Sequence, residues 1–274
     1  MFADDTNIFY STKDPKELEL TINTELSNVI NYCNANKLSI NFKKTNYMII
    51  ASPRKNVDIT ITACNIERKN TIKYLGIYID NHLKWKTHIQ HIKIKISKNL
   101  GIIYKLRYLV SITLLKQLYY SLIYPYISYG IMSWGTACQT RLQTIKRKQN
   151  KCLRAIFFAP MNESATPFYQ LLEIHELNSI FEIKDSTLVY KLRNSHPNLP
   201  SALSNLISVS SHVHNHNTRL AVKDNLHRPV SRTNYGLSRF AAIASKIWEK
   251  IPFPLKKLPF QSFLKQIKRF YLNS

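Results

Sequence analysis

The chain has 274 residues, of which 45% are hydrophobic and 11% aromatic, so it has enough apolar material for a core and is not a disordered tail. Its 39 Lys and Arg residues against 16 Asp and Glu residues give a formal net charge of +23. A protein this basic is expected to bind a polyanion, with nucleic acid as the first candidate and an acidic membrane surface as the second. The sequence contains no GxGxxG or GxxxxGKS/T pattern, which excludes a glycine-rich phosphate loop.

The cysteines and the N-terminus bear on the compartment. Cys33, Cys64, Cys138 and Cys152 show no CxxC pattern and no Cys/His spacing typical of zinc sites. We therefore expect free thiols in a reduced, intracellular setting. Acids near the start, with no charged-then-apolar segment after them, predict that the chain carries no signal peptide, while nucleus and cytoplasm both stay open.

The first distinctive pattern is the pair Asp4-Asp5, which lies between short apolar runs rich in β-forming residues. This pattern predicts a tight β-hairpin over residues 2–10 with the two acids at its tip. Adjacent carboxylates repel each other unless a cation lies between them, and Mg²⁺ prefers such oxygen ligands. The alternative is that either acid only caps a turn or a helix.

Residues 15–34 are predicted to form an amphipathic helix. Asp14 followed by Pro15 is typical of a helix start. Apolar residues then recur at three- and four-residue spacing from Leu18 to Cys33, with Asn, Glu and Thr on the opposite face. We expect this helix to cover one face of a sheet.

Alternating apolar residues predict strands at 38–42 and at 57–61, and a second apolar run covers 47–50. Residues 72–79 are expected to be the hairpin partner of the 57–61 strand, closing at Gly76. Strands together with one helix make the first 80 residues an α+β unit.

Residues 117–137 carry no charge and resemble a membrane span in that respect alone. Tyrosines and serines are scattered through the stretch, whereas true spans are mostly aliphatic with aromatics at the two ends. We therefore predict a buried helix that is interrupted at Pro125, and a membrane association is not favoured.

Between Asn81 and Asn162 the chain has no Asp or Glu, while Lys and Arg recur throughout. Apolar periodicity predicts a helix over 85–106, a second that Ser111 caps, and a third over 142–156. A solvated face normally mixes both signs, so we favour a surface for a nucleic-acid backbone over a merely solvated face. The predicted nucleic-acid-binding residues are Lys86, Lys93, Lys95, Lys98, Lys105, Lys146, Arg147, Lys148, Lys151 and Arg154.

The remaining chain is predicted to be mostly helical. One helical region covers 165–194, a Pro/Ser/Asn-rich stretch at 196–211 is the best linker, and short helices follow at 238–250 and 258–271. Three histidines alternate after the linker: His212, His214 and His216. Alternating histidines suit a metal site, but no Cys or acid lies near them, so metal binding is the less favoured interpretation.

Several motifs occur in one characteristic order. Phe2-Ala3-Asp4-Asp5 comes first, Leu38-Ser39-Ile40-Asn41 with Lys44-Thr45 comes second, and Lys73-Tyr74-Leu75-Gly76-Ile77 with Asp80 comes third. Later segments include Asn217-Thr218-Arg219, Arg232-Thr233-Asn234-Tyr235-Gly236, Ile247-Trp248 and Ile251-Pro252. In this order they resemble the carboxyl-terminal half of the reverse transcriptase of non-LTR retrotransposons (LINE-type elements), over nearly the whole chain.

The resemblance implies RNA-templated DNA synthesis by two-metal nucleotidyl transfer, with RNA template, DNA primer and dNTPs as partners and no small-molecule cofactor. Asp4 and Asp5 would be catalytic carboxylates that bind Mg²⁺. Lys44 would lie near the nucleotide phosphates, with an exposed strand-end lysine as the alternative. Tyr74, Leu75 and Gly76 would grip the primer end, although Tyr74 and Leu75 also suit a core.

The predicted fold class is α+β. A partial reverse-transcriptase palm, made of one helix and antiparallel strands, occupies 1–80, and an all-helical basic thumb occupies 81–160. A helical extension (161–195), a linker (196–217) and a small helical C-terminal region (218–274) follow.

The resemblance also implies parts that this sequence does not contain. The family's palm has a third metal-binding aspartate on an earlier strand, and its fingers hold template and nucleotide. We therefore expect weak Mg²⁺ binding and a truncated chain without polymerase activity. The alternative is a non-catalytic, basic nucleic-acid-binding protein derived from the thumb.

Overall fold

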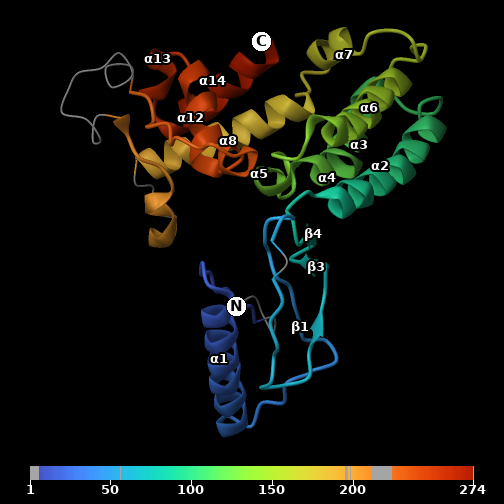
Figure 1. The fold of residues 1–274 in the computed structure, drawn as a ribbon. Coiled ribbons are helices and arrows are strands. Elements are labelled where there is room, and N and C mark those ends of the chain that lie inside the picture. The colour runs from blue at the N-terminus through green and yellow to red at the C-terminus, as the bar shows by residue number, and fades with distance from the viewer. Residues whose placement is uncertain (1–5, 56, 195–196, 198, 211–223, 274) are drawn as a thin grey trace. The chain divides into compact units, whose positions relative to one another are not determined.

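The computed structural model describes residues 6–55, 57–194, 197, 199–210 and 224–273 (Figure 1). The chain divides into two compact units, Met1–His88 and Ile89–Ser274, which we call the N-terminal unit and the helical unit. The mixture of many helices with a few short strands agrees with the predicted α+β class.

The N-terminal unit contains the predicted amphipathic helix as α1 (Pro15–Ala35). The Asp14 side chain caps it by accepting from the backbone N–H of Lys16 at 3.0 Å. No residue of α1 is buried. Its Asn23 side chain instead holds an irregular segment, because its Nδ2 donates to the Thr60 carbonyl and its Oδ1 accepts from the Thr62 backbone N–H. The expectation that this helix covers a sheet face is therefore wrong.

The strands of the N-terminal unit are shorter and paired differently than predicted. β1 (Asn46–Tyr47) pairs in parallel with β2 (Glu67–Arg68). β3 (Thr71–Tyr74) and β4 (Ile77–Asp80) form an antiparallel hairpin, with Thr71 opposite Asp80.

The predicted strands at 38–42 and 57–61 do not form. The Asn41 side chain accepts from the backbone N–H of Lys44, and this local turn takes the place of a strand ladder. Thr60, in the second predicted strand, gives its carbonyl to the α1 contact rather than to a neighbouring strand. Residues 72–79 consequently close on themselves and do not pair with 57–61.

The structure describes the predicted hairpin over 2–10 from residue 6 onward. Asp4 and Asp5 lie outside the described residues. Residues 6–10 are not in a strand, and the Phe9 side chain is 77% exposed, with its ring 6.3 Å from that of Tyr74. A strand at 6–10 is therefore wrong, since this backbone has no ladder partner in the described part of the chain.

The helical unit begins with the predicted basic helices. The α2 helix (Lys86–Leu106) starts at the end of the N-terminal unit, and Ser111 caps α3 (Ile112–Leu122) by accepting from the Leu114 backbone N–H. Pro125 lies in the first turn of α4 (Tyr124–Ser128), so the predicted interruption is confirmed. Two further helices complete this group: α5 (Ile131–Trp134) and α6 (Gln139–Ile156).

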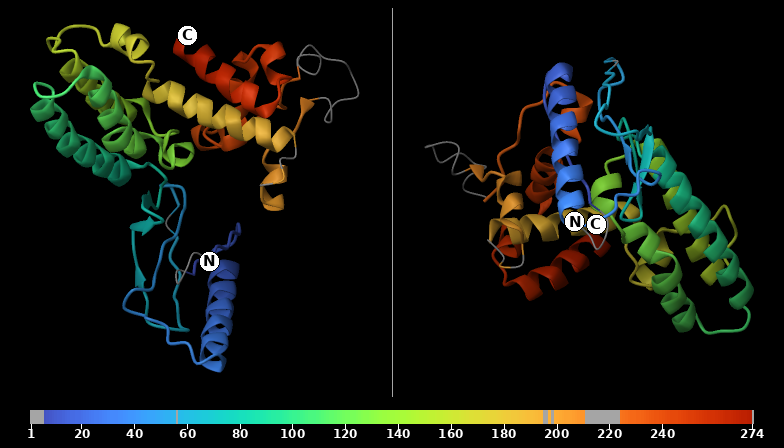
Figure 2. Two further views of the ribbon diagram at one scale, coloured as in Figure 1. Left: turned by 180° about the vertical axis from the view of Figure 1, so that it is seen from behind. Right: turned by 90° about the horizontal axis from the view of Figure 1, so that it is seen from below.

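The α8 helix (Leu177–Arg193) connects two parts of the helical unit. Figures 1 and 2 show α2, α3 and α6 side by side near its beginning, and α12 (Phe240–Lys250) and α14 (Phe260–Asn273) packed on its later part. The shorter helices are α7 (Thr166–Leu171), the 3-10 helix η1 (Ser201–Leu206), α11 (Asn234–Leu237) and α13 (Phe253–Lys256).

The core of the helical unit is apolar and aromatic. The largest side chains without exposed surface are Trp134, Trp248, Tyr119 and Phe263. Cys152 is also fully buried, and burial raises the pKa of its thiol to about 12. Cys138, by contrast, is exposed, and none of the four cysteines is in a disulfide.

Two predicted features fall at the edge of what the structure describes. Part of the predicted linker is ordered, because η1 lies within it and Val209 pairs with Leu226. His212, His214 and His216 lie outside the described residues. Within the described ranges, no helix has the length and apolar character that crossing a bilayer requires.

Candidate nucleic-acid interface

The α2 helix places apolar and basic residues on different faces. Ile92, Ile96 and Ile103 are buried, and their four- and seven-residue spacing places them on one side of the helix. Four predicted nucleic-acid-binding lysines of α2 are exposed: Lys86, Lys95, Lys98 and Lys105. None of them forms an ion pair with an acid of the described residues.

The α6 helix adds a second set of cations. Arg147 is exposed, while Lys148, Lys151 and Arg154 are half-buried. The Arg154 Nε donates to the Glu163 carbonyl at 2.6 Å, so a backbone oxygen and not a carboxylate holds it. None of these four side chains forms an ion pair with an acid of the described residues.

Lys146 differs from the other predicted contacts. Its Nζ is 2.6 Å from Oε2 of Glu176, and both side chains are largely covered. The ion pair fixes Lys146 against the residue that precedes α8. Its charge is therefore balanced within the protein, and its first role is structural.

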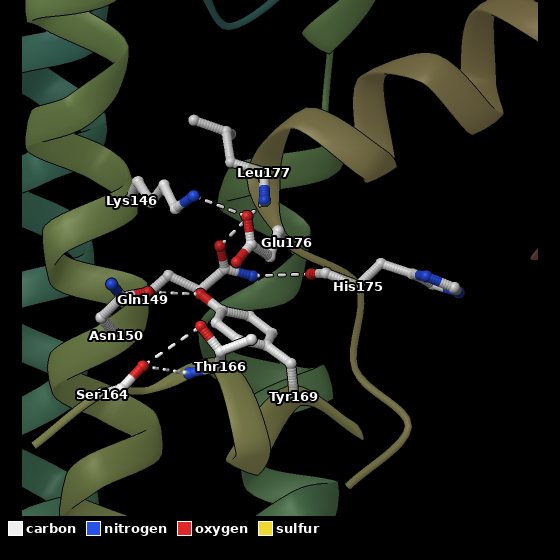
Figure 3. A network of polar contacts seen from close by, with 9 residues as sticks. All are labelled: Lys146, Gln149, Asn150, Ser164, Thr166, Tyr169, His175, Glu176 and Leu177. Atoms are coloured by element: carbon white, nitrogen blue, oxygen red, sulfur yellow. Dashed lines mark hydrogen bonds and ion pairs between the residues drawn. The ribbon is translucent and has the colours of Figure 1, made fainter. Parts of the chain in front are cut away.

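A polar network surrounds Gln149, which is fully buried on α6 (Figure 3). Its Nε2 donates to the His175 carbonyl and to the Tyr119 hydroxyl, both at 2.8 Å. Its Oε1 accepts from the Leu177 backbone N–H at 3.0 Å. One side chain thereby joins α3, α6 and the start of α8, and all of these buried polar groups are paired.

Nearby residues extend this network (Figure 3). The Tyr169 hydroxyl donates to Oδ1 of Asn150 at 2.7 Å, which joins α7 to α6. Burial raises the pKa of Tyr169 and lowers that of His175, and the charge of Lys268 lowers the His175 pKa further. The basic helix α6 is thus held rigidly from its inner side.

Sequence reasoning missed the Gln149 network, although a signal is present. Gln149 lies four residues after Ile145 and three before Cys152, so helical spacing places it in the apolar stripe. A polar residue at such a position predicts a buried hydrogen-bonding role.

A second missed feature is Asp185 on α8, which is 1% exposed. Neither of its oxygens has a hydrogen-bond partner in the described part of the chain. Burial, with a smaller contribution from the charge of Glu182, raises the pKa of this carboxyl to about 8.

The residues predicted to grip the primer lie together at the end of the β3–β4 hairpin. Leu75 and Gly76 form its turn, with φ of 44° and 81°, and Tyr74 is half-buried. Two positive φ values are typical of the tight turn that joins twisted antiparallel strands. Leu75 is exposed and Tyr74 is half-buried, so neither Tyr74 nor Leu75 is a core side chain.

Lys44 is exposed in the turn that begins at Asn41, and its described hydrogen bonds are those of its backbone. Asp80, at the end of the hairpin, accepts from the backbone N–H groups of Lys84 and Trp85 at 2.8 and 2.5 Å and so holds the two residues that precede α2. Among the described residues, no group of three or more His, Cys, Asp or Glu side chains is placed to hold a metal ion.

Comparison with known proteins gives two similar sequences from Drosophila melanogaster. The "Probable RNA-directed DNA polymerase from transposon BS" is 24% identical over 204 residues, covering 71% of this chain and 22% of the relative. The "Probable RNA-directed DNA polymerase from transposon X-element" is 24% identical over 159 residues, covering 57% of this chain and 18% of the relative. The chain is similar to transposon RNA-directed DNA polymerases.

This similarity supports the relationship to reverse transcriptases that the motifs predict. The chain spans about a fifth of the length of these curated relatives. No family model matches it, and no solved structure matches it.

Proposed function

We propose that the chain is a part of the RNA-directed DNA polymerase of a non-LTR transposon, and that its helical unit binds the backbone of template and primer. The observation that carries the proposal is the cationic surface of α2 and α6. It lies in a stretch of chain that contains no Asp or Glu. The similarity to two transposon polymerases supports the choice of template and primer as the polyanion.

The placement of the lysines favours binding to a phosphate backbone. A nucleic-acid backbone carries a layer of condensed cations, and lysines that neutralise its phosphates release those cations with a gain in entropy. Lysines without acidic partners are available for this role. Apolar residues on the inner face of α2 and the Gln149 network behind α6 keep the cations on fixed helices. A fixed row of charges suits a regular phosphate spacing better than a flexible tail does.

The polymerase roles in the N-terminal unit are part of the same proposal. Asp4 and Asp5 hold Mg²⁺, Lys44 lies near the nucleotide phosphates, and Tyr74, Leu75 and Gly76 contact the primer end. These roles rest on the motif pattern and on the similarity to the transposon polymerases. The division into palm, thumb, extension, linker and tail stays a prediction.

The binding proposal is tested with a DNA-primed RNA template in a fluorescence anisotropy titration over a range of salt concentrations. Combined Lys95→Ala, Lys98→Ala and Lys105→Ala should weaken binding and flatten the slope of log affinity against log salt by about 2 to 3, because each phosphate contact contributes about 0.9 to that slope. The charge-matched control combines Lys246→Ala, Lys265→Ala and Arg269→Ala, all exposed on α12 and α14. Equal losses in both triple variants, or binding that is insensitive to salt, would refute the α2 surface.

The metal role has a separate test. Asp4→Ala should leave the affinity for the primed template unchanged, because binding is assigned to the helical unit. Primer extension with dNTPs and Mg²⁺ tests the expectation that this chain alone is inactive. Incorporation that Asp4→Ala abolishes would overturn that expectation and establish the polymerase role directly.

A further inference from the structure

An aromatic and cationic cluster lies where the ends of α2 and α6 meet. Its members are Tyr104 near the end of α2, Arg107 and Tyr108 just after it, Lys151 on α6 and Phe158 just after α6. The Arg107 guanidinium lies 4.7 Å from the ring centroids of both Tyr108 and Phe158 and 5.0 Å from that of Tyr104. The Lys151 Nζ lies 5.6 Å from the Tyr104 ring. We call this set the Arg107 cluster.

Two rings of the Arg107 cluster face solvent. Tyr108 is 69% exposed and Phe158 is 51% exposed, and the two rings meet edge to face at 5.1 Å. Leu109 and Met161, close by in sequence, are exposed too. Exposed aromatic rings in mutual contact are candidates for a site of interaction, whereas apolar residues scattered singly over a surface are normal.

The backbone at Phe158 adds an independent indication. Phe158 has a φ of 56°, in the left-handed region that favours glycine. The Ala159 backbone N–H donates to the Arg154 carbonyl, which is the hydrogen bond of a helix end whose left-handed residue is usually glycine. A bulky aromatic residue therefore occupies a backbone position that favours glycine. This indicates that the Phe158 side chain has a role other than folding.

The charge of the Arg107 cluster restricts the kind of partner. All five members lie in the stretch that contains no Asp or Glu. The Nε of Arg107 is buried and has no hydrogen-bond partner among the described residues, while its Nη2 donates to the Tyr108 hydroxyl at 2.5 Å. This hydrogen bond and the surrounding rings hold the guanidinium in place. Exposed aromatic faces beside fixed cations suit a ligand that carries both flat rings and negative charge.

We propose that the Arg107 cluster binds single-stranded nucleic acid, with an unpaired base stacked on Tyr108 and Phe158 and the adjoining phosphates near Arg107 and Lys151. Stacking on aromatic side chains beside a basic groove is the usual way in which single strands are held without sequence preference. The proposal rests on the proposed function and deepens it, because it assigns to one end of α2 and α6 the unpaired strand next to the paired template and primer.

The test compares Phe158→Gly and Tyr108→Ala with the wild-type chain, using anisotropy of labelled oligo(U), oligo(dT) and a strand of equal length with abasic sites. Each variant should lose about 5- to 100-fold in affinity for the strands with bases, because stacking is lost. Affinity for the abasic strand and for a fully paired hybrid should stay within about twofold, and the salt slope should not change. Tyr235→Ala, which removes an exposed tyrosine on α11, is the matched control and should behave as wild type.

Phe158→Gly also separates function from folding. Glycine suits the left-handed backbone, so this variant should unfold at a higher temperature than wild type while it binds single strands more weakly. The RNA and DNA strands report which of the two is preferred, and either preference supports the stacking site. Unchanged affinity in both variants, or equal losses on the abasic strand, would overturn the site but leave the proposed function standing. Failure of the wild-type chain to bind any nucleic acid would overturn both.

Discussion

Asp185 is a carboxyl group held inside the protein without a compensating cation. Its raised pKa, about 8, means that it stays protonated at neutral pH in the folded state. The nearby Glu182 is already paired with Lys250, at 2.7 Å, so the cation of that pair is engaged elsewhere. Asp185 therefore lowers the stability of the helical unit wherever the unfolded chain would ionise it.

We predict that the stability of the helical unit falls as pH rises from about 4 to about 8. Below pH 4 the carboxyl is protonated in both states; between the two pKa values only the unfolded state loses the proton, which favours unfolding. The full difference is on the order of 5 kcal/mol. Asp185→Asn should remove this pH dependence and stabilise the protein at pH 8, as measured by urea unfolding followed by tryptophan fluorescence.

His175 also makes stability depend on pH, so the effect of Asp185 must be measured as the difference between wild type and Asp185→Asn. The pKa of His175 is lowered, so its contribution to stability is lost as pH falls below 6.5. Both proteins share this contribution, and their difference isolates Asp185. Identical pH profiles for wild type and Asp185→Asn would contradict the predicted ionisation.

Gln149 is the residue whose replacement we expect to lower the free energy of unfolding most. Gln149→Met keeps the size of the side chain but leaves the Tyr119 hydroxyl, the His175 carbonyl and the Leu177 N–H without their partner. We expect a loss of about 3 kcal/mol in the free energy of unfolding, because buried polar groups left unpaired cost about 1 to 3 kcal/mol each and the site partly relaxes. Gln143→Met, exposed on the same helix, is the control and should change stability little. Equal effects would show that the network is not needed.

At the scale of elements, two glycines should respond to alanine with opposite signs. A Cβ at Gly101, in the interior of α2, would meet nothing within 4 Å, so Gly101→Ala should stabilise by up to about 1 kcal/mol through helix propensity. A Cβ at Gly135, after α5, would lie 2.5 Å from the Ile131 carbonyl and 2.6 Å from the Phe181 ring on α8. Gly135→Ala should therefore destabilise by about 1 to 3 kcal/mol. Thermal unfolding of both variants checks the pair, and a shift of the same sign would contradict it.

Helices were more predictable than strands for a physical reason. The apolar stripe, the Ser111 cap and the break at Pro125 are all local in sequence, so α2, α3, α4 and α6 follow from the pattern. The alternating residues at 57–61 satisfy a strand pattern equally well, yet a strand needs a partner that the pattern does not name. Here the Asn23 side chain forms hydrogen bonds with the Thr60 carbonyl and the Thr62 N–H, which a partner strand would otherwise bind.

At the scale of the whole molecule, burial is distributed unevenly. Among residues 6–88, the described residues that are buried are Ile59, Trp85 and His88. The helical unit, in contrast, has a continuous aromatic and aliphatic core along α8. A single helix without buried residues is only marginally stable in water.

We therefore predict that the amides of α1 exchange with solvent roughly 100-fold faster than those of α6 and α8. Hydrogen–deuterium exchange with mass spectrometry measures all three helices in one experiment. Comparable protection of α1 and α6 would show that the N-terminal unit is stabilised by contacts beyond those described.

The positive charge of the candidate site was predictable from the sequence, but the contacts among its side chains were not. The absence of acids between Asn81 and Asn162 is visible in the sequence, and it predicts a basic surface. Lys146 could not be separated from its neighbours, because its partner Glu176 lies 30 residues further along the chain. The Arg107 cluster was equally hidden, since Phe158 and Arg107 lie far apart in the sequence and meet only in the folded bundle.

The buried thiol of Cys152 has a practical consequence. Only a thiolate reacts with an alkylating reagent, and a thiol with a pKa of about 12 at the centre of the helical unit stays unreactive while the bundle is closed. Its labelling rate thus records how often that centre opens, and the exposed Cys138 supplies an internal reference in the same molecule. A mass spectrum of the alkylated chain can therefore follow whether a bound nucleic acid slows the opening of the very helices proposed to hold it.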